Sequence, residues 1–282
     1  MKDYLEQIGY ALTDRWRPRK RAVYDGFIFF NELEILKLRL QELYEHVDKF
    51  VLVEANMTFQ SRPKPLYFQD NKDQFQEFKD KIIHIIVEDM PNSPDPMVNE
   101  VHQRNAISRG FVGCRDYDIV LVSDIDEIPN YQAIDYYKAK HLFSIKKLEQ
   151  KLYYYYLNIY TNSPWRLSYI ASYFNIKGKN LNTIRKSMTK KKHKRHLLYN
   201  GGWHFSYLGG VDSIIQKLEA FSHNDYNTDK YKNRERLINC MNEGKDLFDR
   251  QDYKYELLNI DESFPRQVVD NIDYYQQIGW IK

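Results

Sequence analysis

The sequence has only two cysteines, Cys114 and Cys240, among its 282 residues. Two cysteines are too few for a disulfide framework, and their spacing does not fit a thiolate zinc site. This low cysteine content suits a protein of a reducing compartment. No run approaches the roughly 18 apolar residues of a membrane span. The polar stretch 1–10 also lacks the pattern of a signal peptide. We therefore expect a soluble, cytoplasmic protein without a transmembrane segment.

An excess of charge of one sign is also missing. Lysine and arginine number 42 against 39 aspartates and glutamates, so the net charge is only +3. A balance of this kind gives no general reason to expect a nucleic-acid partner, and any basic binding site must be local. With 43% hydrophobic residues the chain is long enough to bury a core of its own.

The first half of the chain alternates apolar strands with helices. Leu33, Leu36 and Leu40 recur at helical spacing after a first strand, and Asn31 stands at the predicted N-cap of that helix. We expect strands at 23–30, 49–54, 82–87 and 118–122, and helices at 31–47, 70–79 and 98–110. This order predicts an α/β fold with a Rossmann-like, doubly wound and mostly parallel sheet. Ligands of such sheets bind beyond the carboxyl ends of the strands, close to Asn31, Glu54 and Asp124.

The second half is less regular. We expect a helix at 131–139, strands at 151–160, 166–176 and 202–207, and a helix at 211–221. Between them, residues 185–196 include seven lysines or arginines and two histidines, which we interpret as a mobile basic loop. The predicted organisation is a basic extension (1–22), a main domain with two halves (23–130 and 131–225), and a C-terminal helical segment (226–282).

Two carboxylates, Asp124 and Asp126, follow the apolar strand 118–122. Because they are two residues apart, strand geometry would project both to one side, where they could share a cation. Oxygen ligands of this kind suit Mg²⁺ or Mn²⁺, and such an ion can bridge the phosphates of a nucleoside diphosphate. Acids at strand ends also commonly cap the next helix, but the central position of this strand favours the metal site.

Three further candidates are less specific. Arg104 and Asn105 lie on a predicted helix and could hold phosphate or a base edge, although a solvated helix face would look the same. His204 follows Trp203 in a predicted strand and could complete the metal shell, with His223 as a rival ligand and a core histidine as the alternative. The aromatic candidates, which could stack on sugar rings or simply fill the core, are Tyr153 to Tyr156, Trp165 and Trp203.

Asp212 follows Gly209 and Gly210 at the start of a predicted helix. Glycosyl transfer with inversion needs one carboxylate to take the proton from the attacking hydroxyl. The alternative for Asp212 is a helix cap or a favourable interaction with the helix dipole. The sequence does not separate the two interpretations.

Six segments in the same order, within residues 24–225, resemble glycosyltransferase family 17. They are 30–34, 50–56, 64–68, 103–107, 122–129 and 202–207. The resemblance implies an inverting enzyme of the GT-A fold that uses Mn²⁺ (or Mg²⁺) and a UDP-sugar, such as UDP-N-acetylglucosamine, with a glycan or glycoconjugate as acceptor. It implies that Asp126 and His204 bind the metal, that Asp124 faces the ribose or the metal, and that Arg104 and Asn105 line the nucleotide site. An acid at Asp212 fits the same pattern. The resemblance also implies that residues 23–225 are the catalytic domain, with 23–130 as its nucleotide-sugar half and 131–225 as its acceptor half.

Two other functions remain open from the residues alone. A sugar-phosphate nucleotidyltransferase also uses a parallel sheet and paired acids, but it would need a glycine-rich phosphate loop after its first strand, where this chain has Phe30, Asn31 and Glu32. A non-catalytic carbohydrate-binding protein would use the aromatic strands, without metal and without affinity for UDP.

Overall fold

A computed structural model describes residues 20–91, 93–187, 191–222, 224–251 and 253–282. Its strands are β1 (Val23–Ile28), β2 (Lys49–Ala55), β3 (Ile82–Val87), β4 (Ile119–Asp124), β5 (Glu127–Pro129), β6 (Lys146–Tyr154), β7 (Ile159–Trp165), β8 (Tyr169–Ser172), β9 (Leu197–Ser206) and β10 (Glu256–Leu257). Its α-helices are α2 (Leu33–Leu43), α3 (Tyr67–Asn71), α4 (Pro96–Asn105), α5 (Tyr131–Ala139), α6 (Leu181–Lys186), α7 (Gly210–Ala220), α8 (Asp229–Lys232), α9 (Arg234–Glu243), α10 (Arg266–Val269) and α11 (Ile272–Gln277). Short 3-10 helices span Lys72–Phe78, Ala106–Gly110, Tyr173–Asn175, Lys191–His196 and Asn224–Tyr226.

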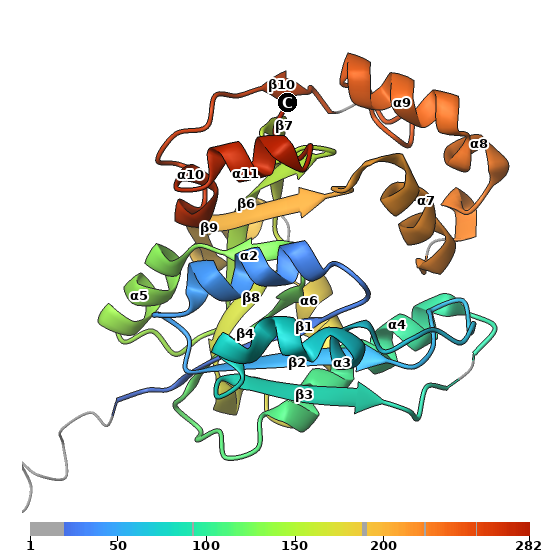
Figure 1. The fold of residues 1–282 in the computed structure, drawn as a ribbon. Coiled ribbons are helices and arrows are strands. Elements are labelled where there is room, and N and C mark those ends of the chain that lie inside the picture. Colours follow the sequence, from blue (N-terminus) through green and yellow to red (C-terminus); the bar gives the residue numbers. More distant parts are fainter. Residues whose placement is uncertain (1–19, 92, 188–190, 223, 252) are drawn as a thin grey trace, which may run out of the picture.

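The described strands form one ten-stranded sheet in which β10-β7-β6-β8-β4-β1-β2-β3 are neighbours in that order. The four strands β3, β2, β1 and β4 are all parallel, and each apolar strand is joined to the next through helical segments (Figure 1). Beyond β4 the pairing becomes antiparallel through β8, β6 and β7, while β9 runs parallel to β6 and antiparallel to β5. The expected mixed α/β fold with a parallel central sheet is confirmed.

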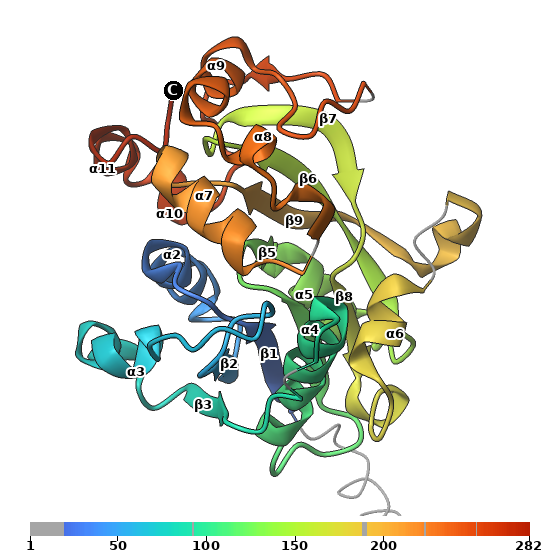
Figure 2. The ribbon, with the colours of Figure 1, turned by 90° about the vertical axis from the view of Figure 1, so that its right-hand side faces the viewer.

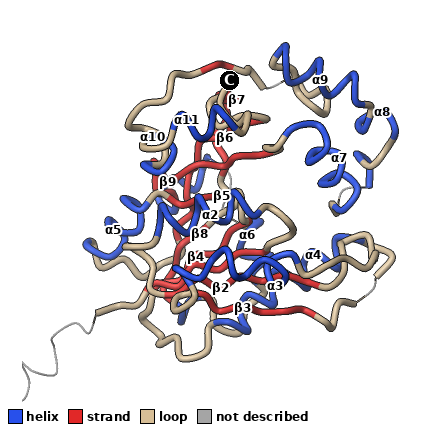
Figure 3. The backbone as a smooth tube through the Cα atoms, viewed as in Figure 1, coloured by secondary structure: helices blue, strands red, loops and turns tan. Residues whose placement is uncertain are grey.

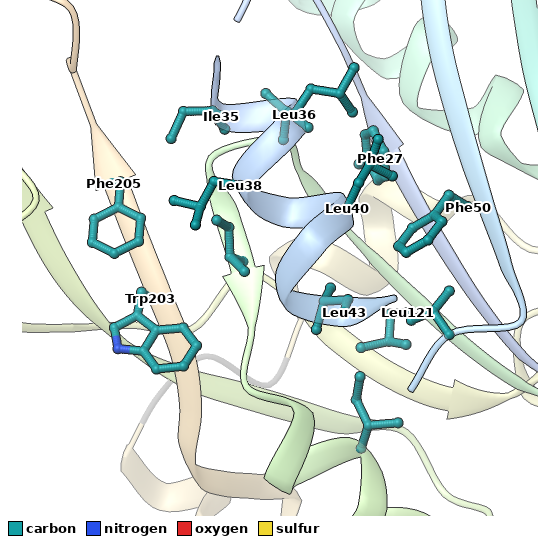
Figure 4. Packing of buried hydrophobic residues seen from close by; sticks show 14 of the residues in the cluster. Phe27, Ile35, Leu36, Leu38, Leu40, Leu43, Phe50, Leu121, Trp203 and Phe205 are labelled. Atoms are coloured by element: carbon teal, nitrogen blue, oxygen red, sulfur yellow. The ribbon is translucent and has the colours of Figure 1, made fainter. Parts of the chain in front are cut away.

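Helices cover both faces of the parallel strands (Figure 3). On one face α2 lies between two parts of the sheet, as Figure 4 shows. Leu40 and Leu43 face Phe27 and Phe50, while Leu38 faces the strand that carries Trp203 and Phe205. Because α2 is apolar on more than one side, its burial joins the parallel half of the sheet to β9.

The opposite face is covered by the 3-10 helix Ala106–Gly110 and by α6, whose apolar residues belong to the same buried cluster as those of β2 and β4. Helix α4 leads into this 3-10 helix, and its Gln103 donates a hydrogen bond to the carbonyl of Val53 in β2. A third apolar cluster joins α7 and α9 to the ends of β6 and β9. Residues after 225 also add β10 to β7, and they pack α10 and α11 into the same core as α2. The division of the chain into domains stays a prediction.

Two local predictions need correction. The helix expected to begin after an Asn31 cap begins at Leu33, with Glu32 at the N-cap position. Glu32 instead turns its carboxylate back to accept hydrogen bonds from the backbone N–H groups of Phe30 and Asn31. The single strand expected at 151–160 is two antiparallel strands, β6 and β7, because the chain reverses through Tyr155 in the left-handed region, with φ of 65°.

The interpretation of residues 185–196 as a mobile loop is wrong for Arg185, which lies in the last turn of α6 and is buried. Residues 188–190 of that segment, and most of the N-terminal extension (1–19), lie outside the described residues. Within the described ranges, no helix is long and apolar enough to cross a membrane.

Candidate functional site

The carboxyl ends of the parallel strands open into a cavity of about 450 Å³. In Figure 2 these ends face the viewer, with α7 and α4 on opposite sides of them. One wall of the cavity consists mainly of residues that follow β1, β2 and β4 or lie on α4. The other wall comes from β9, α7 and residues near the C-terminal segment. The lining carries six cationic side chains, from Lys64, Arg104, Arg185, Lys186, Lys217 and Arg250.

Asp126 and His204 meet at this cavity, although they are 78 positions apart in the sequence. The antiparallel pairing of β5 with β9 places Glu127 beside His204, which brings the preceding turn against the imidazole. The Nε2 atom of His204 lies 3.5 Å from Oδ1 of Asp126. The other ring nitrogen, Nδ1, is buried and has no hydrogen-bond partner among the described residues.

The second oxygen of Asp126 is held by Lys217 of α7, with 2.7 Å between Nζ and Oδ2. Burial alone would raise the pKa of Asp126, but Lys217 and His204 outweigh it and hold this pKa well below its usual range. Asp126 is therefore ionised at neutral pH. A carboxyl group that binds a metal must likewise be deprotonated.

Asp124 lies at the end of β4, also on the cavity, and its carboxylate is bound by two arginines. Arg104 of α4 donates to Oδ1, and Arg185 donates to Oδ2 over 2.6 Å. Arg104 also donates to Glu100, another cavity residue. Two of the expected donor-site residues, Arg104 and Asp124, are thus brought together, but two guanidinium groups already balance the charge of the Asp124 carboxylate.

Glu127 is a buried anchor for this corner. Its carboxylate accepts hydrogen bonds from Arg185, Ser168, the indole N–H of Trp165 and the backbone N–H of Asp124. Burial raises the pKa of Glu127, but the guanidinium of Arg185 more than reverses the effect and keeps the carboxylate ionised. Fixed in this way, Glu127 determines where Arg185 and Trp165 lie beside the cavity.

Arg39 of α2 holds the turn that carries Asp124 and Asp126 from behind. Its Nη1 atom lies 2.9 Å, 3.2 Å and 3.1 Å from the carbonyl oxygens of Asp124, Ile125 and Glu127. The same guanidinium forms a two-pronged ion pair with Asp25 of β1. The planar guanidinium carries five N–H donors, so Arg39 can bind the Asp25 carboxylate and the carbonyl oxygens of the turn at the same time. The turn is therefore held by a side chain more than 80 positions away in the sequence.

Four of the expected site residues do not line the cavity. Asn31 donates to Gln216 of α7 over 2.7 Å. Glu54 is fully buried and accepts from the backbone N–H groups at the start of α3 and from His84. Asn105 accepts from the backbone N–H of Leu181, where α6 begins. Their contacts position elements around the cavity, and their roles in donor binding stay predictions.

Asp212, the fourth, lies in the first turn of α7, where its charge suits the helix dipole. It makes no capping hydrogen bond, because Gly209 occupies the N-cap position, and it pairs instead with Arg234 of α9. Its side chain is 83% exposed. The rival metal ligand His223 lies outside the described residues.

Sequence reasoning missed Arg185, Lys217 and Glu100, all of which line the cavity. The partners of Arg185 and Lys217 are Asp124 and Asp126, 61 and 91 positions away, so no local pattern marks them. Glu100 has one local partner, Arg104, four positions away, but the hydrogen bond that it accepts from Ser222 spans 122 positions. Among the aromatic candidates, Trp165 and Tyr154 line the cavity, whereas Trp203 is a core residue whose indole donates to the carbonyl of Ser263. Trp165 lies against His204, with ring centroids 4.5 Å apart.

The pattern of one protein family, described as Glycosyltransferase family 17, matches residues 9–268. The chain belongs to glycosyltransferase family 17. The resemblance seen in the six sequence segments is thereby confirmed.

This family 17 chain is similar to proteins named β-1,4-mannosyl-glycoprotein 4-β-N-acetylglucosaminyltransferase. It is 27% identical over 126 residues to those of Rattus norvegicus and Homo sapiens, and 26% identical to that of Mus musculus. Each match covers 41% of this chain. It spans only 23% or 24% of the length of these relatives.

Proposed function

We propose that this chain is a GT-A type, metal-dependent and inverting glycosyltransferase that moves N-acetylglucosamine from a UDP donor to a hydroxyl group of a glycan. The observation that carries the proposal is the meeting of Asp126 and His204 in a cavity rich in cationic side chains, at the carboxyl ends of the parallel strands. The names of the relatives support the donor sugar.

The residues present fit a divalent cation that the donor completes. No group of three or more His, Cys, Asp or Glu side chains within the described part of the chain is placed to hold a metal alone. Mg²⁺ and similar ions, however, are usually bound through one or two carboxylates together with substrate phosphates. Asp126 and His204 supply an ionised carboxylate and an imidazole of the type that Mn²⁺ accepts. A metal held by Asp126 and His204 would offset the negative charge that develops on the phosphates as UDP leaves.

The nucleotide half of the cavity supplies the remaining donor contacts. Phe30, Met57 and Phe59 form an apolar wall suited to a planar base. Asp124 keeps acceptor capacity, because each carboxylate oxygen has two lone-pair sites and each already takes one arginine hydrogen bond. We propose that Asp124 accepts a ribose hydroxyl and that Arg104 holds it in place. Lys64 and Lys186 add positive charge for the diphosphate.

The acceptor side is formed by aromatic side chains. Tyr226 and Phe248 line the cavity and contact each other, with ring centroids 4.0 Å apart. Flat apolar faces of this kind suit the C–H faces of sugar rings. We propose that the acceptor glycan binds here, opposite the nucleotide wall, so that its hydroxyl approaches the donor sugar from the side away from UDP.

The general base has two candidates. Asp212 remains the expectation from the sequence, and a base there would have to leave Arg234 and approach the cavity. Asp225 is exposed and already lines the acceptor side beside Tyr226. Either carboxylate would take the proton of the attacking hydroxyl, and position favours Asp225.

The test is calorimetric binding of UDP with Mn²⁺ and with EDTA, together with product analysis from UDP-N-acetylglucosamine. We expect manganese-dependent UDP binding and slow release of UDP. Asp126→Asn should abolish both, whereas Asp229→Asn, the same change on exposed α8, should alter neither. UTP formation from the donor and pyrophosphate would indicate a nucleotidyltransferase instead. Binding of glycans without any UDP affinity would indicate a non-catalytic carbohydrate-binding protein.

A further inference from the structure

Lys217 stands where it conflicts with the proposed metal. Its ammonium group lies 2.7 Å from Oδ2 of Asp126, and its side chain is 23% exposed, on the cavity. A divalent cation bound to Asp126 would meet this positive charge at contact distance. Two positive charges on one carboxylate repel each other, which weakens the binding of each.

If a metal displaced Lys217 from Asp126, the ammonium group would need another anionic partner. Glu32 also lines the cavity, but its Oε2 already accepts from two backbone N–H groups, and among the described residues no hydrogen bond joins Glu32 to Lys217. A partly buried ammonium that leaves Asp126 therefore needs a new anion. The diphosphate of the donor arrives in the same cavity together with the metal and supplies that anion. A lysine side chain has enough rotatable bonds to make this move without a shift of the backbone.

The setting of α7 fits a residue that changes partner. The helix is entered through Gly209 and Gly210, with φ values of 89° and 79°, in the left-handed region that other residues avoid. Its far end reaches the nucleotide half, where the carbonyl of Phe221 accepts from Gln60 over 2.6 Å and Ser222 donates to Glu100. Lys217 is thus placed between Asp126 on one side and the nucleotide wall on the other.

We propose that Lys217 is a diphosphate-binding residue that neutralises Asp126 in the donor-free enzyme and exchanges onto the donor's phosphates when the metal takes Asp126. The inference rests on the proposed function, because it requires a donor with phosphates. It assigns opposite effects to one side chain: Lys217 competes with the metal before the donor binds and supports donor binding afterwards.

Two titrations measure these effects separately. Manganese binding without nucleotide is followed by the electron paramagnetic resonance signal of free Mn²⁺, and UDP binding is followed by calorimetry at saturating Mn²⁺. A hydrogen bond to a charged group is worth about 1.5–3 kcal/mol, so Lys217→Met should change each affinity by about ten- to a hundredfold. The manganese affinity should rise, and the UDP affinity should fall. Lys217→Arg keeps the charge and should stay closer to the wild type in both titrations.

Lys64→Met is the matched control, because Lys64 also lines the cavity but donates to the carbonyl of Pro65 and not to Asp126. If loss of any positive charge in the cavity were enough, Lys64→Met would raise the manganese affinity as much as Lys217→Met does, and the exchange would be refuted. An unchanged or weaker manganese affinity in a folded Lys217→Met or Lys217→Gln variant would also overturn it. A wild-type chain whose UDP affinity ignores manganese would contradict the proposed function itself.

Discussion

Replacing Arg39 by methionine should destabilise the fold by a large fraction of its total stability. Arg39 and Asp25 are both fully buried, and their guanidinium and carboxylate lie 2.8 Å and 2.7 Å apart at the two contacts. Removing one partner of such a pair leaves an uncompensated buried charge and costs about 3–5 kcal/mol. A domain of this kind is stable by only about 5–15 kcal/mol. The three carbonyl oxygens of the 124–127 turn would lose a donor as well.

Urea unfolding followed by circular dichroism measures the loss, with Arg266→Met as the control. Arg266 is 78% exposed and pairs with Asp270 on the surface, so its removal should leave the midpoint almost unchanged. The double variant Asp25→Asn, Arg39→Met should be more stable than Arg39→Met alone, because it removes the stranded carboxylate. A loss below about 1 kcal/mol in Arg39→Met, or a double variant as unstable as the sum of its parts, would refute this reasoning.

Three further predictions concern binding and turnover. Burial lowers the pKa of Lys64 to about 8. Because an anionic donor prefers the protonated lysine, UDP affinity should stay constant below that pH and weaken as the pH rises through it. Calorimetry between about pH 7 and about pH 9.5 measures this change, and Lys64→Arg should remove it. Asp225→Asn should leave UDP affinity near that of the wild type and lower turnover by about a hundredfold or more; if Asp212→Asn does this and Asp225→Asn does not, the base is Asp212. Phe248→Ala should raise KM for a glycan acceptor by about fivefold or more while UDP affinity stays unchanged, and an equal loss of UDP affinity would show that Phe248 does not belong to an acceptor subsite.

Most of the fold follows from local patterns. Apolar runs and helical spacing predict the positions of the strands β2 and β3 and of the helix α5. They do so because the pattern of apolar residues that these elements bury can be recognised in consecutive positions of the sequence. The turn at Tyr155 does not follow in this way. The run of four tyrosines at 153–156 looks like one continuous strand, and only the packing of β7 against β6 reveals the reversal.

In the candidate site, too, some residues follow from local patterns and others depend on contacts between distant parts of the sequence. Asp124 and Asp126 could be predicted because carboxyl ends of parallel strands meet at one edge, and the two residues end or follow the apolar strand β4. His204 lies within β9, where its place in an apolar strand and the family resemblance pointed to it. Arg185 was hidden within a basic run whose composition suggests a solvated loop, while its burial depends on Glu127 and Asp124. Lys217 was hidden for a different reason, since a lysine on an amphipathic helix looks like surface until Asp126 is placed beside it.

The central claim is that Asp126 and His204 bind a divalent cation together with the phosphates of a donor. Anomalous diffraction at the manganese edge, from crystals grown with MnCl₂ and UDP, tests it most directly. The account predicts a manganese peak within coordination distance of one oxygen of Asp126, of Nε2 of His204 and of the UDP phosphates, with Lys217 no longer on Asp126. UDP bound in the cavity with no manganese between Asp126 and the phosphates would contradict it.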